Sequence, residues 1–360
     1  MNLIKLGWNE FFEKHFNEVK TKEIFPARVS TAQREIYCIY SNFGEFKAEI
    51  SGKFRFNATS MSDFPAVGDW VIVRLSPEGD LAIIEGILPR ISKLSRKVVG
   101  SIIDEQILVA NIDTVFLVNG LDGNYNLRRI ERYLTLVKDS NVKPVILLNK
   151  TDVCSNIQEK IVEVESISFG VPIYTLSALN SKGIESLKEY IKKGNTIAFL
   201  GSSGAGKSTI INCLLGEERL KVGAVRDSDS RGRHITTHRE LIILPEGGIV
   251  IDNPGLRELQ IWTNENTLED TFSDIGAFAA KCRFRDCNHT DEPECVIRSA
   301  IERGDLDSKR FQNYTKLKKE LRYLATRKEK IKSRNERIIT EKKISKLSKQ
   351  IEKHKRNYQF

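Results

Sequence analysis

One stretch of the chain has residue types that suit the binding of phosphate groups. Residues 201–208 read GSSGAGKS and lie between the apolar runs TIAFLG and TIINCLL, which matches G-x-x-x-x-G-K-[ST] between a strand and a helix. Glycines in such a loop let backbone N–H groups curl around a phosphate, with the positive end of the next helix behind them. The alternative is a plain Gly/Ser-rich turn. Phosphate contacts are expected from Gly201, Ser202, Ser203, Gly204, Ala205, Gly206, Lys207, Ser208 and Thr209.

The end of this loop and a later strand end carry residues that could neutralise phosphate charge and ligate Mg²⁺. Lys207 would neutralise the β- and γ-phosphates of a nucleotide, and the Ser208 hydroxyl would ligate Mg²⁺. The phrase DNPG (252–255) follows the apolar run GGIVI, where a carboxylate would hold Mg²⁺ through water. We therefore expect Asp252 at the metal and the backbone N–H of Gly255 at the γ-phosphate.

A polar segment between these two phrases, RGRHITTH (231–238), is of the kind that forms a mobile switch. Thr237, or its neighbour Thr236, is the candidate for the second protein ligand to Mg²⁺. Leu256 occupies a position where Ras-like enzymes keep a water-orienting glutamine. We therefore expect slow intrinsic hydrolysis of the nucleotide and a partner that completes the site. Within the chain, His234 is the catalytic candidate, and a solvent-facing loop histidine is the alternative.

The phrase NKTD (149–152) ends a predicted strand and would read a guanine base. The Asp152 carboxylate can accept hydrogen bonds from N1–H and N2–H of guanine, a pair that adenine does not present. Asn149 would bond O6 or tie loops together, and the Lys150 stem would cover the ring face. Such a site rejects the wrong base by about 10⁴-fold or more, because its polar groups would stay unpaired. The residues expected at guanine are Asn149, Lys150, Thr151, Asp152 and, from the next strand end, Ser177 and Ala178.

The order of these phrases is unusual, because the base-reading phrase normally follows the phosphate loop. Ligands of an open α/β sheet bind outside the carboxyl ends of its strands, and that geometry does not fix which strand comes first along the chain. Joining the usual termini and cutting between the metal-binding strand and the base-reading strand leaves the pocket intact. The sequence therefore predicts a circularly permuted GTPase.

A second chemical cluster lies in the stretch CRFRDCNHTDEPEC (282–295). Four soft ligands within fourteen residues suit a closed, tetrahedral, structural zinc site. A disulfide, which the cytosol disfavours, and unbound core thiols are the alternatives. Because zinc contributes about 10–16 kcal/mol in small modules, the metal would fold this segment. The expected ligands of this one zinc ion are Cys282, Cys287, His289 and Cys295.

The elements that would position these residues change character along the chain. After a short helix at 8–19, residues 24–95 hold short β-branched and aromatic segments separated by Gly, Asn, Pro and Asp turns. They predict an OB-type barrel of about five strands, although an SH3-like barrel would look much the same. The strand segments are 35–42, 47–56, 69–75 and 81–88.

From about residue 105, apolar strands alternate with helices, which predicts a parallel sheet covered on both faces. The expected strands are 114–120, 144–150, 172–179, 196–201 and part of 247–255, and the expected helices are 127–140, 156–168 and 184–194. The predicted organisation is therefore multidomain. It comprises an all-β OB-type barrel (1–95), an α/β circularly permuted P-loop GTPase domain (105–262) and an α-helical zinc-binding domain with a basic tail (263–360).

The charge of the 360-residue chain is unevenly placed. Residues 309–356 contain 19 Lys and Arg against 5 Asp and Glu, whereas the whole chain carries only +9. A basic appendage on a mildly acidic body indicates a polyanionic partner such as nucleic acid, and a solvated helix face is the alternative. In that helix Leu317, Leu324, Ile331 and Ile338 fall seven apart, so one face is apolar.

Membrane and export signals are not recognised in the sequence. No apolar run approaches the roughly 18 residues that a spanning helix needs, and the first residues, MNLIKLGWNEFFEKHFNE, do not resemble a signal peptide. We therefore expect a cytoplasmic protein without membrane contact. The heptad spacing of the tail is the one sign of self-association, and a monomer can bury the same face against its own body.

In combination, the phrases NKTD, SAL, GSSGAGKST, RGRHITTH and DNPG, followed by C-x₄-C-x-H-x₅-C, resemble the ribosome small subunit-dependent GTPases of the RsgA type. The resemblance covers nearly the whole chain. It implies an OB-fold, a permuted GTPase domain and a zinc-binding domain that act in late maturation of the small ribosomal subunit. It also implies that the small subunit and its rRNA are partners, that the subunit stimulates hydrolysis and that His234 takes part. Ile235 departs from the family, which often has a third threonine there, so the choice between Thr236 and Thr237 stays open.

Two other classes of protein remain as alternatives. One is an ATP-dependent kinase that uses the phosphate loop, and NKTD argues against it. The other is a non-catalytic RNA-binding scaffold with a vestigial nucleotide site. The intact Lys207, Ser208 and Asp252 argue against that reading.

Overall fold

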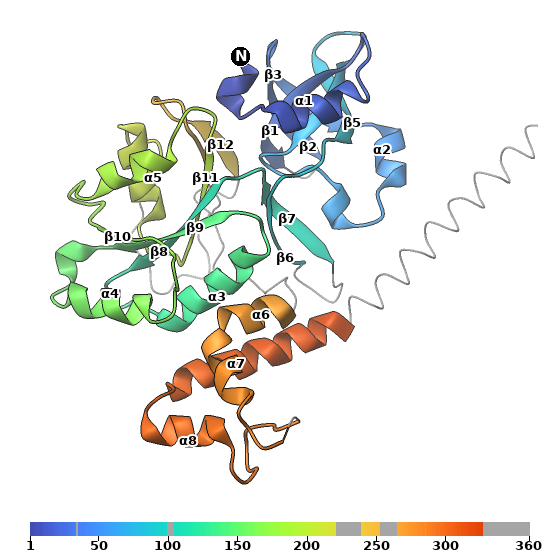
Figure 1. Cartoon of the computed structure of the whole chain (residues 1–360). Helices are drawn as coiled ribbons and strands as arrows, with labels where there is room; N and C mark the ends of the chain where they lie inside the picture. Colours follow the sequence, from blue (N-terminus) through green and yellow to red (C-terminus); the bar gives the residue numbers. More distant parts are fainter. Residues whose placement is uncertain (34, 99–103, 221–238, 253–264, 285, 327–360) are drawn as a thin grey trace, which may run out of the picture.

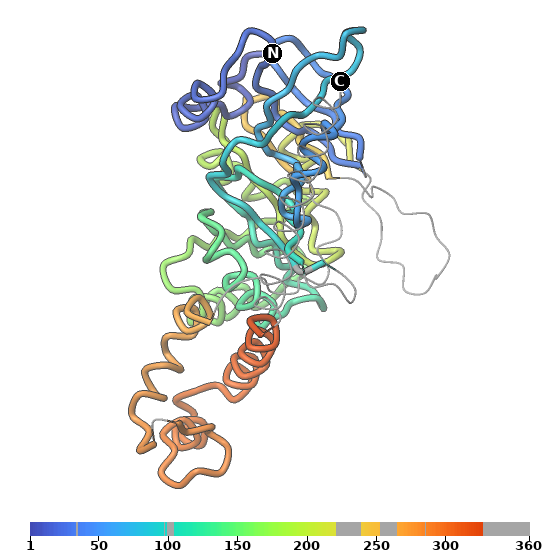
Figure 2. The backbone as a smooth tube through the Cα atoms, turned by 90° about the vertical axis from the view of Figure 1, so that its right-hand side faces the viewer, coloured from blue at the N-terminus to red at the C-terminus, as the bar shows by residue number. Residues whose placement is uncertain are grey.

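The computed structural model describes residues 1–33, 35–98, 104–220, 239–252, 265–284 and 286–326. A barrel, a central α/β part and a helical segment follow one another along the molecule, with the helical segment at the end away from the barrel (Figures 1 and 2). Within these ranges, no helix is both long and apolar enough to cross a bilayer.

The N-terminal barrel is closed by five strands. They run in the order β1-β2-β3-β5-β4, and β1 also pairs with β4. Alternate side chains of these strands, such as Val29, Ile39 and Val71, are fully buried in the barrel interior. The five strands are β1 (Phe25–Gln33), β2 (Ile36–Ser41), β3 (Gly44–Ile50), β4 (Trp70–Leu75) and β5 (Leu81–Ile87).

One predicted strand of the barrel is wrong in its second half. The segment 47–56 was expected to be extended throughout, but it is a strand only to Ile50, and Gly52–Asn57 form helix α2. The Ser51 hydroxyl oxygen accepts a hydrogen bond from the Phe54 backbone N–H at 3.1 Å. This is an N-cap, which starts a helix whatever the β propensity of the following aromatics.

The central sheet has five parallel strands with an antiparallel strand at one side. Their order is β10-β9-β8-β11-β13-β12. Helices α3 and α4 cover one face and α5 and η4 cover the other, as their separate hydrophobic clusters show. The predicted parallel sheet covered on both faces is confirmed, although 184–190 is a 3₁₀ helix. The strands are β8 (Thr114–Gly120), β9 (Lys143–Asn149), β10 (Ile173–Leu176), β11 (Thr196–Gly201), β12 (Glu240–Ile243) and β13 (Ile249–Asp252); the helices are α3 (Leu127–Lys138), η3 (Thr151–Val153), α4 (Ile157–Glu165), η4 (Ile184–Tyr190) and α5 (Lys207–Leu215).

Barrel and central sheet are joined through the backbone. Strand β12 pairs with β1 at Glu240 and Thr31, so that the two sheets form one eleven-stranded sheet. The fully buried Arg28 guanidinium donates to the carbonyl oxygens of Leu6, Gly68 at 3.2 Å and Asn111 at 2.8 Å. It thereby links the N-terminal segment, the barrel and the central part. The elements around this joint are η1 (Leu3–Leu6), α1 (Glu10–Asn17), η2 (Met61–Asp63), β6 (Lys93–Lys97) and β7 (Glu105–Ala110).

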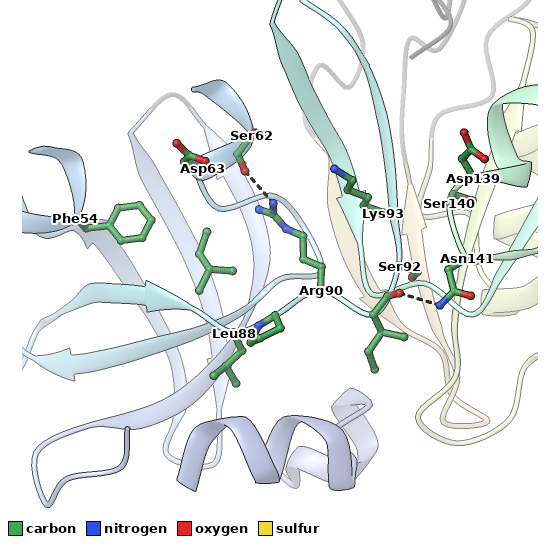
Figure 3. A pocket seen from close by; sticks show the side chains of 13 residues that line it. Phe54, Ser62, Asp63, Leu88, Arg90, Ser92, Lys93, Asp139, Ser140 and Asn141 are labelled. Atoms are coloured by element: carbon green, nitrogen blue, oxygen red, sulfur yellow. Dashed lines mark hydrogen bonds between the residues drawn. The ribbon is translucent and has the colours of Figure 1, made fainter. Parts of the chain in front are cut away.

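A cavity of about 620 Å³ lies at the same joint (Figure 3). The basic side chains on its wall already have acidic partners: Arg90 pairs with Asp69 at 2.7 Å and Lys93 with Glu105 at 2.8 Å. Asn141 donates across the cavity to the Ile91 carbonyl at 3.0 Å. The cavity therefore belongs to the joint between barrel and sheet and is separate from the sheet edge with the nucleotide phrases.

The C-terminal segment packs against α3. It consists of α6 (Glu265–Thr271), α7 (Ser273–Ala279), α8 (Val296–Arg303) and a helix at 308–326. Leu317, Leu321 and Leu324 are buried against the core that also contains α3. The predicted apolar helix face is confirmed for these leucines, whereas Ile331 and Ile338 lie outside the described residues.

A buried ion-pair network fixes this packing. Glu131 of α3 is fully buried and accepts hydrogen bonds from Arg310 at 2.6 Å and Asn313 at 2.7 Å. Arg310, itself 4% exposed, also pairs with Asp274 at 2.7 Å. Burial raises the pKa of Glu131 even though Arg128 and Arg310 favour its charged form. The network therefore holds one relative orientation of α3, α7 and the 308–326 helix.

We predict that Arg310→Met loosens the C-terminal segment, because it removes the buried one of the two arginines that pair with the buried Glu131 charge. Removing one member of a buried pair costs about 3–5 kcal/mol. Hydrogen exchange of residues 265–326 should show a fall of this size in the opening free energy, and adding Glu131→Gln should restore part of it.

The matched control is Arg322→Met, whose pair with Glu265 is solvent-exposed and is worth at most about 1 kcal/mol. Equal exchange behaviour of the two variants would refute the role given to the Glu131–Arg310 pair.

Candidate nucleotide-binding edge and Cys/His cluster

Asn149 brings the base-reading and phosphate phrases together. Its Nδ2 donates to the Ala205 carbonyl of the phosphate loop at 2.9 Å, and its Oδ1 accepts the backbone N–H of Ala178 at 3.0 Å. The side chain is 2% exposed. Of the two roles considered for Asn149, the described contacts are those of a residue that ties loops together.

The phosphate loop needs glycine at the point where Asn149 approaches. Gly206 has a φ of +98°, and a Cβ there would lie 2.1 Å from Asn149 Nδ2. Gly201, at the end of β11, is equally constrained, since a Cβ would lie 2.4 Å from the Val118 carbonyl oxygen. The spacing of these glycines is therefore required by two close approaches of the backbone.

The basic end of the loop has the donors that a phosphate group needs. Lys207 begins α5, and its Nζ donates to the carbonyl oxygens of Gly201 at 2.8 Å and Ser202 at 2.7 Å. The Ser202 hydroxyl oxygen is buried without a hydrogen-bond partner. A lysine ammonium held beside the loop, a helix N-terminus and an unpaired buried hydroxyl together fit a bound anion. The remaining loop residues, Ser203, Gly204, Ser208 and Thr209, lie around the same helix start.

The base-reading residues lie at the ends of β9 and β10. The exposed Asp152, in η3 with Thr151, accepts a hydrogen bond from the buried Ser177 hydroxyl. This bond orients one carboxylate oxygen and leaves the other for a ligand. Strands β9 and β10 pair in parallel with Leu176 opposite Asn149, which is why the two phrases meet despite their separation in sequence.

On the metal side, the described residues end at Asp252. This side chain is 7% exposed at the end of β13, which pairs in parallel with β11. The strand register therefore places its carboxylate at the same sheet edge as the phosphate loop. The other predicted residues of this side, His234, Thr236, Thr237 and Gly255, lie outside the described residues.

One residue at this edge was not predicted from the sequence. Asp122 follows β8 and pairs with Lys150 of NKTD at 2.5 Å. Burial opposes its ionisation, but the hydrogen bonds from Lys150 and the Asn124 backbone prevail and hold the pKa of Asp122 below its usual range. The available signal was an acidic residue in the turn after a central strand, at the edge where the other phrases converge.

The Cys/His cluster of the C-terminal segment is compact. The ligand atoms of Cys282, Cys287, His289 and Cys295 all lie within 4.8 Å of one another. His289 Nδ1 is 3.7 Å from Cys282 Sγ and 3.5 Å from Cys295 Sγ. A tetrahedral zinc ion with bonds of about 2.0–2.3 Å separates its ligands by roughly 3.5–3.8 Å. The donor set therefore fits zinc.

The surroundings of the cluster favour metal binding by His289. Partial burial lowers the pKa of His289, which keeps the ring neutral, the form that binds metal. The Glu292 carboxylate accepts the backbone N–H groups of Asn288 at 2.8 Å and Thr290 at 2.9 Å, and such backbone hydrogen bonds lower its pKa to about 2. This carboxylate thus shapes the turn that presents His289.

Comparison with protein families supports this geometry. A family model described as RsgA GTPase matches residues 87–262. A second model, described as ABC transporter, matches residues 184–353, a span that contains the phosphate loop but lacks the base-reading phrase at 149–152. The two models therefore overlap in the part that holds the phosphate loop.

Named relatives and solved structures cover most of the chain. A protein of Oceanobacillus iheyensis named "Small ribosomal subunit biogenesis GTPase RsgA 1" is 45% identical and covers 99% of this chain and 100% of its own length. A similarly named protein of Opitutus terrae is 44% identical and covers 94% of each chain. The structure of YjeQ from Thermotoga maritima matches with a TM-score of 0.58 at 28% identity, over 83% of this chain and 98% of that one.

YloQ, described as a circularly permuted GTPase, matches with a TM-score of 0.55 at 22% identity, over 86% of this chain and 96% of that one. At that identity it shows the fold alone. In the described sheet of this chain, the base-reading strands β9 and β10 precede the phosphate-loop strand β11 in the sequence. Together with the relatives of at least 44% identity along nearly the full length, these findings show that the chain belongs to the RsgA GTPase family.

Proposed function

We propose that this GTPase binds the small ribosomal subunit and uses GTP hydrolysis in the late maturation of that subunit. Binding to the subunit stimulates the hydrolysis. The observation that carries the proposal is the near-complete likeness to relatives named for small-subunit biogenesis. The convergence of base and phosphate phrases on Asn149 supports it, because the relatives' activity needs such a pocket.

The proposed roles follow the contacts at the sheet edge. Asp152, oriented by Ser177, reads the guanine edge, while the Ala178 segment lies beside the base. The phosphate loop and Lys207 hold the phosphates. Ser208 and Asp252, with Thr236 or Thr237, would hold Mg²⁺, which would neutralise phosphate charge during transfer. Gly255 contacts the γ-phosphate, and His234 approaches the attacking water.

The proposed domains are those of the sequence: an OB-type barrel at 1–95, a permuted GTPase domain at 105–262 and a zinc-binding domain with a basic tail at 263–360. The barrel and the tail lie on opposite sides of the GTPase domain in the chain. An extended rRNA surface of the subunit could contact both the barrel and the tail. The 19 basic against 5 acidic residues at 309–356 support contacts of the tail with phosphate groups. We further propose a cytoplasmic monomer without membrane contact.

Exchange of the base-reading carboxylate tests the guanine site. Asp152→Asn should lower GTP affinity by about 10²-fold or more and shift preference toward xanthine nucleotides, whose 2-oxo group pairs with an amide. Calorimetry with GTP and xanthosine triphosphate measures both affinities. The neighbouring exposed Glu159→Gln is the control, and loss of GTP affinity without a gain for the xanthine nucleotide would contradict the assignment.

Metal analysis tests the zinc domain. We expect one zinc ion per full-length chain, and Cys287→Ser should lose it and expose residues 282–303 to hydrogen exchange, because the metal energy is folding energy. Cys38→Ser, in the barrel strand β2, should keep the ion. Unchanged exchange after chelation would exclude a structural zinc site.

The rate of GTP hydrolysis with and without small ribosomal subunits tests the proposed partner. GTP hydrolysis should be slow alone and rise by about 10³-fold or more with purified small subunits, the range for completion of a site in trans. Subunit binding should weaken steeply between low and high salt because phosphate contacts release counterions. Stimulation by large subunits to the same extent would argue against the proposed partner.

A further inference from the structure

The ion pair between Lys150 and Asp122 lies inside the proposed guanine site. Lys150 follows β9, has a φ of +69° and is half-buried, and its ammonium lies 2.5 Å from the Asp122 carboxylate. Asp122 comes from the end of β8, the neighbouring strand. The ends of β8 and β9 are thus joined by Lys150, the residue of NKTD whose aliphatic stem is expected to cover the ring face of the base.

Asp122 is itself held in place, so it can act as a fixed anchor. The backbone N–H of Asn124 donates to its carboxylate at 3.1 Å, and the N–H of Tyr125 donates to its carbonyl at 2.9 Å. The turn is also fastened to NKTD by a hydrogen bond from the Leu121 N–H to the Asn149 carbonyl at 2.8 Å. The anchor therefore moves with the base-reading loop.

Gly120 makes room for the pair. A Cβ at this position would lie 2.8 Å from the nearer Asp122 carboxylate oxygen and 3.5 Å from Lys150 Cδ. The glycine has an ordinary φ, so its role is space. A side chain there would displace the Asp122 carboxylate, whereas Lys150 Cδ would stay at ordinary contact distance.

We propose that Asp122 is a positioning residue for the nucleotide, which holds the Lys150 stem over the ring face of a bound guanine and so slows nucleotide release. The idea rests on the proposed guanine site and adds a residue outside the base-reading phrases. A flexible lysine side chain loses rotamer entropy when it is fixed. An anchor that fixes the stem beforehand removes part of that cost from binding.

The test is the dissociation rate of a fluorescent N-methylanthraniloyl GDP from the full-length, zinc-loaded protein. Asp122→Asn keeps the shape of the side chain but removes the charge. It should speed release by about twofold to fivefold, the range for a half-exposed ion pair. Glu85→Gln, which breaks a similarly exposed pair with Arg74 in the barrel, should leave the rate unchanged.

Two further measurements separate positioning from a general structural effect. In a Lys150→Met background, which keeps an apolar stem without the charge, Asp122→Asn should have no further effect, because the anchor then has nothing to hold. The release of inosine diphosphate, which lacks the N2 group, should speed up by the same factor as that of GDP, since the ring face is common to both.

The outcomes are distinct. A change in release that persists in the Lys150→Met background, or a selective loss of GDP over inosine diphosphate, would overturn the positioning role. Unchanged release in Asp122→Asn would overturn it as well, while leaving the guanine site standing. Equal affinity of the unmodified chain for ATP and GTP would instead remove the guanine site and this inference together.

Discussion

The Asn149 carboxamide is the contact on which the rest of the nucleotide edge depends. It binds the phosphate loop with one end and the Ala178 segment with the other, and both bonds go to backbone groups. These three segments come from β9, β10 and β11, so their positions relative to one another follow from parallel pairing. Chain order does not enter this geometry, and that is why a permuted sequence retains the pocket.

Much of this edge was predictable because its determinants are local. The glycines, Lys207 and the two strand-end phrases are short patterns whose chemistry is visible in the sequence alone. The four ligands of the Cys/His cluster are likewise within fourteen residues of each other. Even Asn149 was assigned two possible roles, one of which the described contacts match.

The sequence did not predict two ion pairs, which join residues far apart in the chain, or helix α2, which depends on one N-cap hydroxyl. The Lys150–Asp122 pair spans 28 residues, and the Arg310–Glu131 pair spans 179, so no periodicity reveals them. Helix α2 replaces a predicted strand because the Ser51 hydroxyl caps it, although Phe54 and Phe56 favour a strand. Strands β6 and β12 have only five and four residues and include charged ones, so neither shows a clear strand pattern in the sequence.

The two joints of the molecule, between barrel and sheet and between α3 and the C-terminal segment, are physically different. The barrel is joined by backbone pairing and by a buried arginine that donates to carbonyl oxygens of three separate segments. The C-terminal segment is joined to α3 by directional ion pairs, which specify orientation more than they stabilise. Its chain, however, continues from Asp252, the metal-side strand end. The Glu131–Arg310 contact therefore holds the segment to α3, the helix that connects β8 to the base-reading strand β9, in addition to this covalent link to the metal side.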